Sequence, residues 1–279
     1  MNNSHINKIN NKVLKTRKSR PSIMPKYILG ILINLIVYDI QGQVNIESQR
    51  MQLDSVRFAF RGDVLFNYSN TNGDYLFQIR PSLTTSFKSK DLRKIFFVMG
   101  NYNLIRSKDV DFQNSWFFHI RYNQKLSQVF RLEGFIQNQN NELFTINSRN
   151  LMGAGIRLKF IDSKVFNGYF GNSYMYEIEK VDILDETYYR HRHNSYLSLT
   201  FNLKNKDDKP VLELTNTTYF QPLYSDFGNH RILQELRADM PLNSYLSLSA
   251  QFDYLLNSFA PTGEQDSSAY LSFGLSVNF

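Results

Sequence analysis

The chain has no cysteine, and beyond its first 42 residues it has no long run of apolar residues. Without cysteine there is no disulfide framework and no thiolate chemistry, either with a metal or in a redox reaction. A transmembrane helix needs about 20 mostly apolar residues in succession, so the body of the chain is not a helical membrane protein. The glycine-rich loop that cradles phosphate groups is also absent from the sequence.

The body of the chain also lacks net charge. The formal net charge of the whole chain is +7, which taken alone favours a nucleic-acid partner. Residues 1–42 hold seven lysines and arginines against the single acid Asp39, so +6 of this charge lies there and +1 in residues 43–279. The distribution therefore predicts no nucleic-acid partner.

The first 42 residues are typical of a secretory signal peptide. A basic region precedes a twelve-residue apolar core, 27–38, which suits a signal peptide and is short for a membrane helix. The ending Gln-Gly-Gln, residues 41–43, supplies a cleavage zone and resembles those of Bacteroidetes-type bacteria. The alternative is an uncleaved anchor. We predict a signal peptide over 1–42, a short periplasmic segment over 43–57 and one domain over 58–279.

Aromatic residues and strict alternation are what this domain has in abundance. The chain contains 23 Phe and 17 Tyr, and in residues 269–279 every odd position is apolar while the even positions are mostly polar. A strand with this pattern has one apolar face, and about eleven residues can cross a bilayer at a tilt. The segment resembles the closing strand of bacterial outer-membrane β-barrels. That resemblance implies that Phe273, Leu275, Val277 and Phe279 are the assembly signal.

Similar alternation recurs along the whole domain, with turn residues between the segments. It predicts twelve strands, at 58–69, 75–88, 95–105, 116–123, 129–139, 149–160, 166–179, 190–203, 211–221, 231–240, 245–255 and 269–279. The connections alternate between short turns and mostly longer loops, as in outer-membrane barrels, which places both termini at the short-turn, periplasmic end. We predict an all-β, transmembrane, antiparallel up-and-down barrel; the alternative is a soluble β-sandwich, whose strands are usually shorter.

If the apolar faces meet lipid, the polar faces line the barrel lumen. Charges of both signs then point inward. One group of polar residues comes together at the outer ends of strands six to ten. Its members are Arg149, Glu177, Glu179, Arg190, Arg192, Tyr219, Gln221, Arg231 and Glu235. One interpretation is a binding or constriction zone for a small polar solute. The other is a structural network, because barrel lumens are polar in general.

Evidence for catalysis or metal binding is weak in the sequence. His191 and His193 share one face of a strand, but that face is the lipid or rim face and no third ligand is apparent. A Ser-His-Asn triad, as in an outer-membrane phospholipase, is recognised by geometry rather than by a motif. We therefore predict no catalytic residues, no metal, no cofactor and no enzymatic activity.

The second half of the chain resembles the YdiY-like, salt-stress-induced outer-membrane proteins, a domain family of unknown function. The matching segments are 149–155, Tyr174 to Glu177, Arg190 to Leu197, 218–222, Arg231 with Glu235, and 273–279. The match is looser before residue 140, and the Asn229-His230 pair stands where the family more often has an acidic residue. The resemblance implies a barrel and no established substrate.

The sequence thus predicts a monomeric outer-membrane barrel that acts as a narrow passive channel or a structural envelope component. One alternative is a barrel-embedded hydrolase acting on lipid. Another is a surface-binding barrel, although the longest predicted loop, about twelve residues, offers little contact area. The expected partners are outer-membrane lipid and lipopolysaccharide, the barrel-assembly machinery and a small polar solute.

Overall fold

A computed structural model describes residues 57–71, 73–108, 113–141, 146–181, 186–258 and 266–279. The predicted signal peptide and nearly all of the predicted segment 43–57 lie outside these residues. No helix long and apolar enough to span a membrane occurs among the described residues.

The described residues form twelve strands, as the sequence predicted. They are β1 (Phe58–Thr71), β2 (Asp74–Lys88), β3 (Lys94–Ser107), β4 (Gln113–Lys125), β5 (Phe130–Asn141), β6 (Ile146–Asp162), β7 (Phe166–Val181), β8 (Glu186–Lys204), β9 (Pro210–Pro222), β10 (His230–Pro241), β11 (Leu246–Asn257) and β12 (Asp266–Asn278).

Several strands extend further than predicted. Residues 180–189 were expected to form a loop, yet β7 continues to Val181 and pairs there with Glu186 of β8. Continued pairing satisfies backbone N–H and C=O groups that a loop would leave to other partners. The contrast between short turns and long loops is consequently smaller than the sequence suggested.

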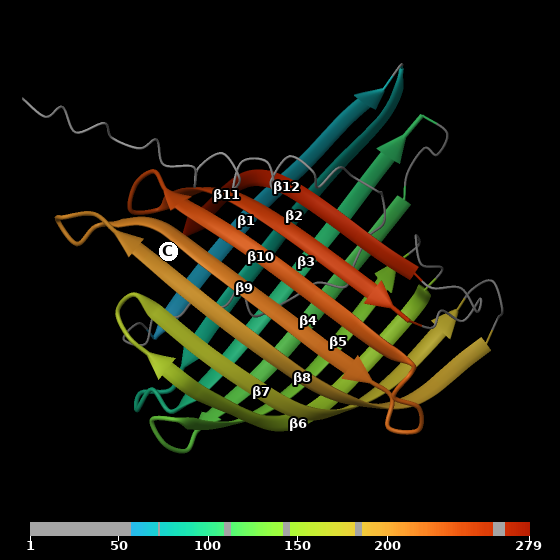
Figure 1. The fold of residues 1–279 in the computed structure, drawn as a ribbon, viewed down its shortest axis with the longest axis horizontal. Helices are drawn as coiled ribbons and strands as arrows, with labels where there is room; N and C mark the ends of the chain where they lie inside the picture. The colour runs from blue at the N-terminus through green and yellow to red at the C-terminus, as the bar shows by residue number, and fades with distance from the viewer. Residues whose placement is uncertain (1–56, 72, 109–112, 142–145, 182–185, 259–265) are drawn as a thin grey trace, which may run out of the picture. The chain divides into compact units, whose positions relative to one another are not determined.

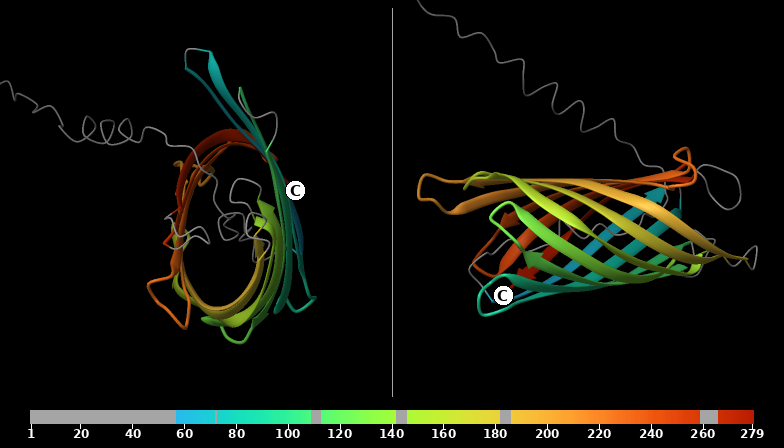
Figure 2. Two further views of the ribbon diagram at one scale, coloured as in Figure 1. Left: turned by 90° about the vertical axis from the view of Figure 1, so that its right-hand side faces the viewer. Right: turned by 90° about the horizontal axis from the view of Figure 1, so that it is seen from below.

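The twelve strands close into a barrel (Figure 1). Each strand runs antiparallel to its neighbours in sequence, and β1 closes the ring by pairing with β12, as the end-on view in Figure 2 shows. Phe60 and Phe279 exchange two backbone hydrogen bonds, each with an N–O distance of 2.9 Å. The start of β1 and the end of β12 therefore lie together, at what we call the C-terminal end; the opposite end is the far end.

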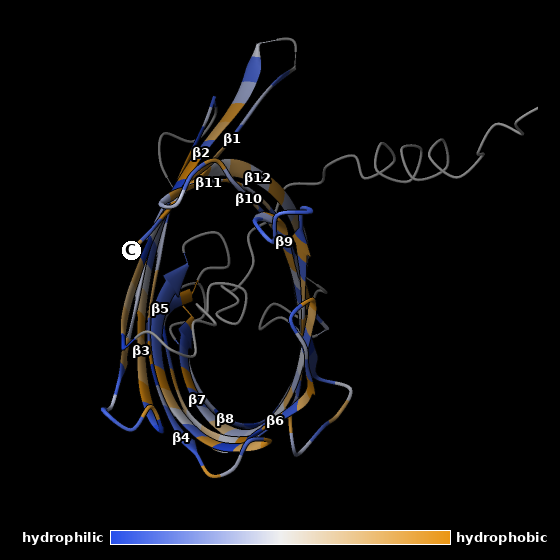
Figure 3. Cartoon of the chain, turned by 90° about the vertical axis from the view of Figure 1, so that its left-hand side faces the viewer, coloured by the Kyte–Doolittle hydropathy of each residue, from blue (hydrophilic) through white to orange (hydrophobic). Residues whose placement is uncertain are grey.

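Apolar side chains face outward and polar side chains face the lumen. In β12, the outward Phe273 and Leu275 are 51% and 46% exposed, whereas Ser272, which precedes Phe273 and points to the other face, is 2% exposed. Figure 3 shows this alternation of hydrophobic and hydrophilic residues along the strands. A soluble sandwich would bury the apolar face instead, so this alternative is wrong. Phe273, Leu275 and Phe279 lie on the outer wall, and their role in assembly stays a prediction.

Strands β3 and β4 depart from this rule, because apolar residues occur on both of their faces. Phe97, Met99 and Phe117 are buried inside the wall and form an apolar cluster. The ring of His119 stacks on that of Phe117, with centroids 6.0 Å apart and an interplanar angle of 2°. Aromatic packing fills this side of the lumen beside the buried pair of Arg121 with Glu133, whose nitrogen and oxygen are 3.4 Å apart.

Candidate functional site

Six of the nine predicted lumen residues meet near the far end of the barrel. The β7–β8 register sets Glu177 opposite Arg190, and the β6–β7 register sets Arg149 opposite Glu179. Arg231 reaches the same place from β10. Because side chains alternate along a strand, residues 190 and 192, like 177 and 179, point into the lumen together. We call Arg149, Glu177, Glu179, Arg190, Arg192 and Arg231 the arginine cluster.

The two glutamates hold this cluster together. Arg231 donates to both oxygens of Glu177, with Nη2–Oε1 at 3.2 Å, and to Oε2 of Glu179 at 3.1 Å. The guanidinium of Arg190 lies 2.9 Å from Glu179 Oε1 and 3.5 Å from Glu177 Oε1. Arg149 Nε donates to Glu179 Oε2 at 2.5 Å. Arg231 thereby joins β10 to β7, so the cluster spans the lumen side of five strands, β6 to β10.

Arg192 and Gln221 form the edge of the cluster. Arg192 Nε lies 3.5 Å from Glu177 Oε2, and its Nη1 donates to the backbone carbonyl of Gln221 at 3.0 Å. The Gln221 side chain donates instead to Asn194 Oδ1 at 2.9 Å. The Asn229 side chain accepts from Arg192 Nη2 at 3.1 Å. Asn229 thus supplies a neutral acceptor to this arginine.

The cluster carries more positive than negative charge. Four guanidinium groups face two carboxylates, and all six side chains are buried. Ion pairing in a low-dielectric site is strong only when each charge is compensated. An excess of guanidinium groups therefore favours anions over cations at this position.

Two of the nine predicted residues lie elsewhere in the lumen. Tyr219 packs against Tyr196, with ring centroids 5.2 Å apart, in an apolar cluster that includes Leu233 and Leu255. Glu235 lies near the middle of β10, directly opposite Asp253 of β11. Neither carboxylate oxygen of Glu235 accepts a hydrogen bond from the described residues. Asp253 is instead bound by Arg80, at 2.8 Å.

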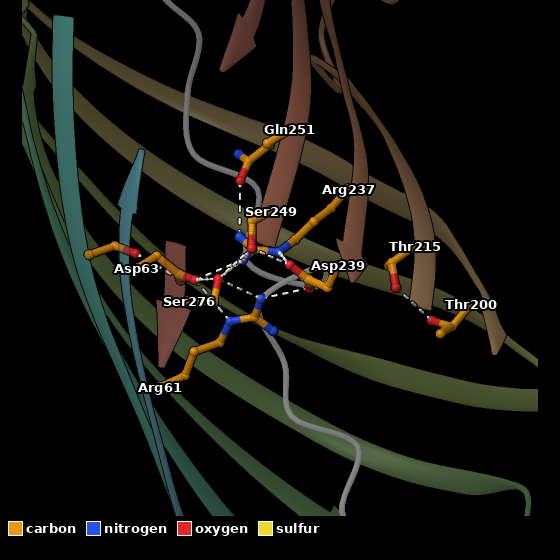
Figure 4. A network of polar contacts seen from close by, with 10 residues as sticks. Arg61, Asp63, Thr200, Thr215, Arg237, Asp239, Ser249, Gln251 and Ser276 are labelled. Atoms are coloured by element: carbon orange, nitrogen blue, oxygen red, sulfur yellow. Dashed lines mark hydrogen bonds and ion pairs between the residues drawn. The ribbon is translucent and has the colours of Figure 1, made fainter. Parts of the chain in front are cut away.

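A second ionic group, which the sequence did not single out, lies nearer the C-terminal end (Figure 4). Arg61 donates to Asp63 at 3.1 Å and to Asp239 at 2.6 Å, and Arg237 donates to Asp239 at 2.9 Å and to Asp63 at 2.7 Å. We call these residues the four-charge network. Its charges balance, and it joins β1 to β10 across β12 and β11. Two Arg-x-Asp segments, 61–63 and 237–239, were the sequence signal for it, since this spacing puts both charges on one face.

The serines of the two intervening strands complete this network. Ser249 donates to Asp239 at 2.5 Å, and Ser276 donates to Asp63. Arg237 also reaches Ser276, at 2.7 Å, and Gln251, at 3.1 Å. Buried charged groups that are paired and also hydrogen-bonded hold a fixed geometry. The network therefore stiffens the wall where the barrel closes.

A cavity of about 760 Å³ lies beside the four-charge network, at the C-terminal end. Arg61 and Asp239 line it together with Glu213, Lys204 and Phe279. Charged and apolar side chains share its wall. The cavity leaves open space next to the four-charge network.

Comparisons with known proteins agree with this architecture. The family model described as "Protein of unknown function, DUF481" matches residues 80–279. The chain belongs to this family. No match was found among curated proteins. The family has no assigned function, so the finer resemblance to salt-stress-induced proteins stays a prediction.

Solved structures with similar folds are outer-membrane barrels. The NanC porin has a TM-score of 0.50 at 12% identity, over 79% of this chain and 98% of that one. The translocator domain of the autotransporter NalP from Neisseria meningitidis has a TM-score of 0.47 at 10% identity, over 83% and 91%. An outer-membrane channel from Pseudomonas putida F1 has a TM-score of 0.46 at 8% identity, over 79% and 92%. At these identities the likeness concerns the fold alone, an outer-membrane β-barrel.

Proposed function

We propose that this DUF481 barrel is a narrow passive channel of the outer membrane that prefers small anions. The observation that carries the proposal is the arginine cluster, in which four guanidinium groups face two carboxylates inside the lumen. Passive selectivity in such pores arises from rings of charged side chains at a constriction. Barrels of about eight strands are filled by side chains and those of 16 strands are open, so twelve strands suit a narrow pore.

The proposal also gives the barrel an orientation. Outer-membrane barrels keep their short turns in the periplasm. The C-terminal end, with its cavity of about 760 Å³, is then the periplasmic mouth, and the arginine cluster lies toward the cell exterior. An anion entering from outside would meet the excess positive charge first, which raises its local concentration.

Planar-bilayer recording of the refolded protein tests the channel. We expect discrete openings and, under a tenfold KCl gradient, a reversal potential of the sign that chloride permeation gives. Arg190→Gln should lower the anion-to-cation permeability ratio several-fold, because it removes one of four guanidinium groups. Lys90→Gln is the matched control, since Lys90 lies in the exposed turn between β2 and β3 and should leave the ratio unchanged. A silent bilayer, or equal ratios in both variants, would contradict the proposal.

The other functions that the sequence left open receive different support. A structural role and a surface-binding role stay predictions. A lipid hydrolase is favoured by a specific arrangement of side chains on the outer wall, which is separate from the lumen.

A further inference from the structure

A histidine and a serine lie in hydrogen-bond contact on the lipid-facing side of β8. His193 Nε2 and Ser195 Oγ are 2.8 Å apart, at positions that share one face of the strand. Both side chains are half-buried on the outer wall. A serine hydroxyl becomes a useful nucleophile when a base within about 2.6–3.2 Å can take its proton. This distance satisfies that requirement.

A third group orients the histidine from the other side. The hydroxyl of Tyr224 lies 3.3 Å from His193 Nδ1, and the two rings meet edge-on with centroids 5.9 Å apart. Tyr224 is held there because its backbone N–H donates to the carbonyl of His191, at 3.0 Å. With the imidazole proton on Nδ1, donated to Tyr224, the Nε2 lone pair faces Ser195. That is the tautomer a general base requires.

A hydrogen-bond donor lies beside the serine. The side-chain nitrogen of Asn172, on β7, is 3.4 Å from Ser195 Oγ and 3.2 Å from His193 Nε2. An amide N–H next to the attacking oxygen can stabilise the negative charge that forms on a carbonyl under attack. Nucleophile, base, orienting group and donor thus come from β7, β8 and the segment after β9.

The depth of this group in the wall indicates its substrate. Toward the far end, the outward residues of β8 are Tyr189 and His191; the next two outward residues beyond Ser195, toward the C-terminal end, are Leu197 and Leu199. Aromatic side chains mark the membrane interface and aliphatic ones the hydrocarbon band. Ser195 lies at the boundary between the two, where the acyl chains of a lipid meet its head group. A shallow, mostly apolar depression lined by Met152, Ala154, Tyr174 and His191 lies on the outer wall nearby and offers a surface for an acyl chain.

We propose that Ser195 and His193 are the nucleophile and general base of a hydrolase for acyl esters of membrane lipids. Ser195 Oγ forms a bond to the ester carbonyl carbon while its proton passes to His193 Nε2. The bond from that carbon to the alkoxy oxygen then breaks, and His193 returns the proton to the departing alcohol. A water molecule next attacks the acyl-serine, giving its proton to His193. Ser195 leaves with that proton, and the fatty acid is released. Asn172 donates to the oxyanion in both halves, and Tyr224 is a positioning residue.

Covalent labelling of the full-length, refolded protein in detergent tests the nucleophile. A fluorophosphonate probe should label Ser195, as located by mass spectrometry, and Ser195→Ala should abolish labelling. His193→Asn should slow labelling by at least about 100-fold, the usual contribution of a general base. Ser198→Ala is the matched control, because Ser198 lies three residues further along β8 and faces the lumen; its labelling should equal that of the parent protein.

Release of fatty acid tests the substrate class. Mixed micelles of phosphatidylethanolamine and, separately, lipopolysaccharide should yield free fatty acid with the parent protein and with Ser198→Ala, but not with Ser195→Ala. Tyr224→Phe should lower kcat several-fold with KM unchanged, since it removes only the acceptor for Nδ1. A folded parent protein that is neither labelled at Ser195 nor able to release fatty acid from either lipid would overturn the proposal. Conductance should be the same in Ser195→Ala, so failure here leaves the channel proposal untouched.

Discussion

Replacing Glu177 with glutamine is expected to destabilise the barrel by about 3–5 kcal/mol, the usual effect of breaking a buried ion pair from one side. Glu177 is 0% exposed and lies within ion-pair distance of Arg190, Arg192 and Arg231. Glutamine has nearly the same volume but no charge, so packing is kept while four guanidinium groups are left with one carboxylate. Urea unfolding of the protein refolded into phospholipid vesicles measures the change. The single tryptophan, Trp116, reports it because it lies on the outer wall.

Glu235 is the matched control for this prediction. It is also 0% exposed, but it faces Asp253 and accepts no hydrogen bond from the described residues. A buried carboxyl group without such bonds is costly, and a neighbouring carboxylate makes it more so. Glu235→Gln should therefore leave the free energy of unfolding unchanged or raise it by about 1 kcal/mol. Equal losses in the two variants would show that burial, rather than ion pairing, makes Glu177 important.

Replacing Gly274 with alanine is expected to weaken or prevent closure of the barrel. Gly274 lies opposite Leu65 in the β1–β12 pair, and a Cβ atom there would lie 1.9 Å from the carbonyl oxygen of Val64. Only backbone movement can relieve such a contact, and overpacking of this kind costs about 3 kcal/mol or more. The β1–β12 pair is also short: residues 61–66 of β1 pair with β12, next to the two hydrogen bonds between Phe60 and Phe279. The folded fraction, measured as the heat-modifiable band on electrophoresis, should fall strongly.

Gly62 provides the comparison at the same seam. It pairs with Val277, and a Cβ atom added there would have its nearest neighbour, a side-chain carbon of Leu83, at 3.7 Å. That is ordinary van der Waals contact, so Gly62→Ala should fold like the parent protein or slightly better, because glycine weakens a strand. Failure of both variants to fold would mean that the seam tolerates no added side chain. Normal folding of Gly274→Ala would mean that β1 and β12 can separate locally without loss of the barrel.

The sequence predicted which residues face the lumen far better than which of them meet. Arg190 and Glu177 were expected together because neighbouring strands of known direction put them at one level. Glu235 was expected there too, although it lies four residues beyond Arg231 along β10, beside Asp253. The four-charge network was not foreseen as a site, even though its Arg-x-Asp spacing was visible. Its partners, Asp63 and Arg237, are 174 positions apart in sequence and meet only because the sheet closes.

Alternation with a period of two is a local property, set by the backbone of each strand, so the sequence alone determined the strands, their apolar outer face and the barrel class. Contacts between strands that are not neighbours depend on how far the wall curves and on the register at the β1–β12 seam. Only the tertiary structure therefore decided that Arg231 of β10 reaches the two glutamates of β7 and that Asp63 meets Arg237. The register between β10 and β11 set Glu235 opposite an aspartate, and side-chain rotamers set the 2.8 Å between His193 and Ser195 on β8. Distances of this kind follow from side-chain positions in three dimensions, which no spacing along one strand specifies.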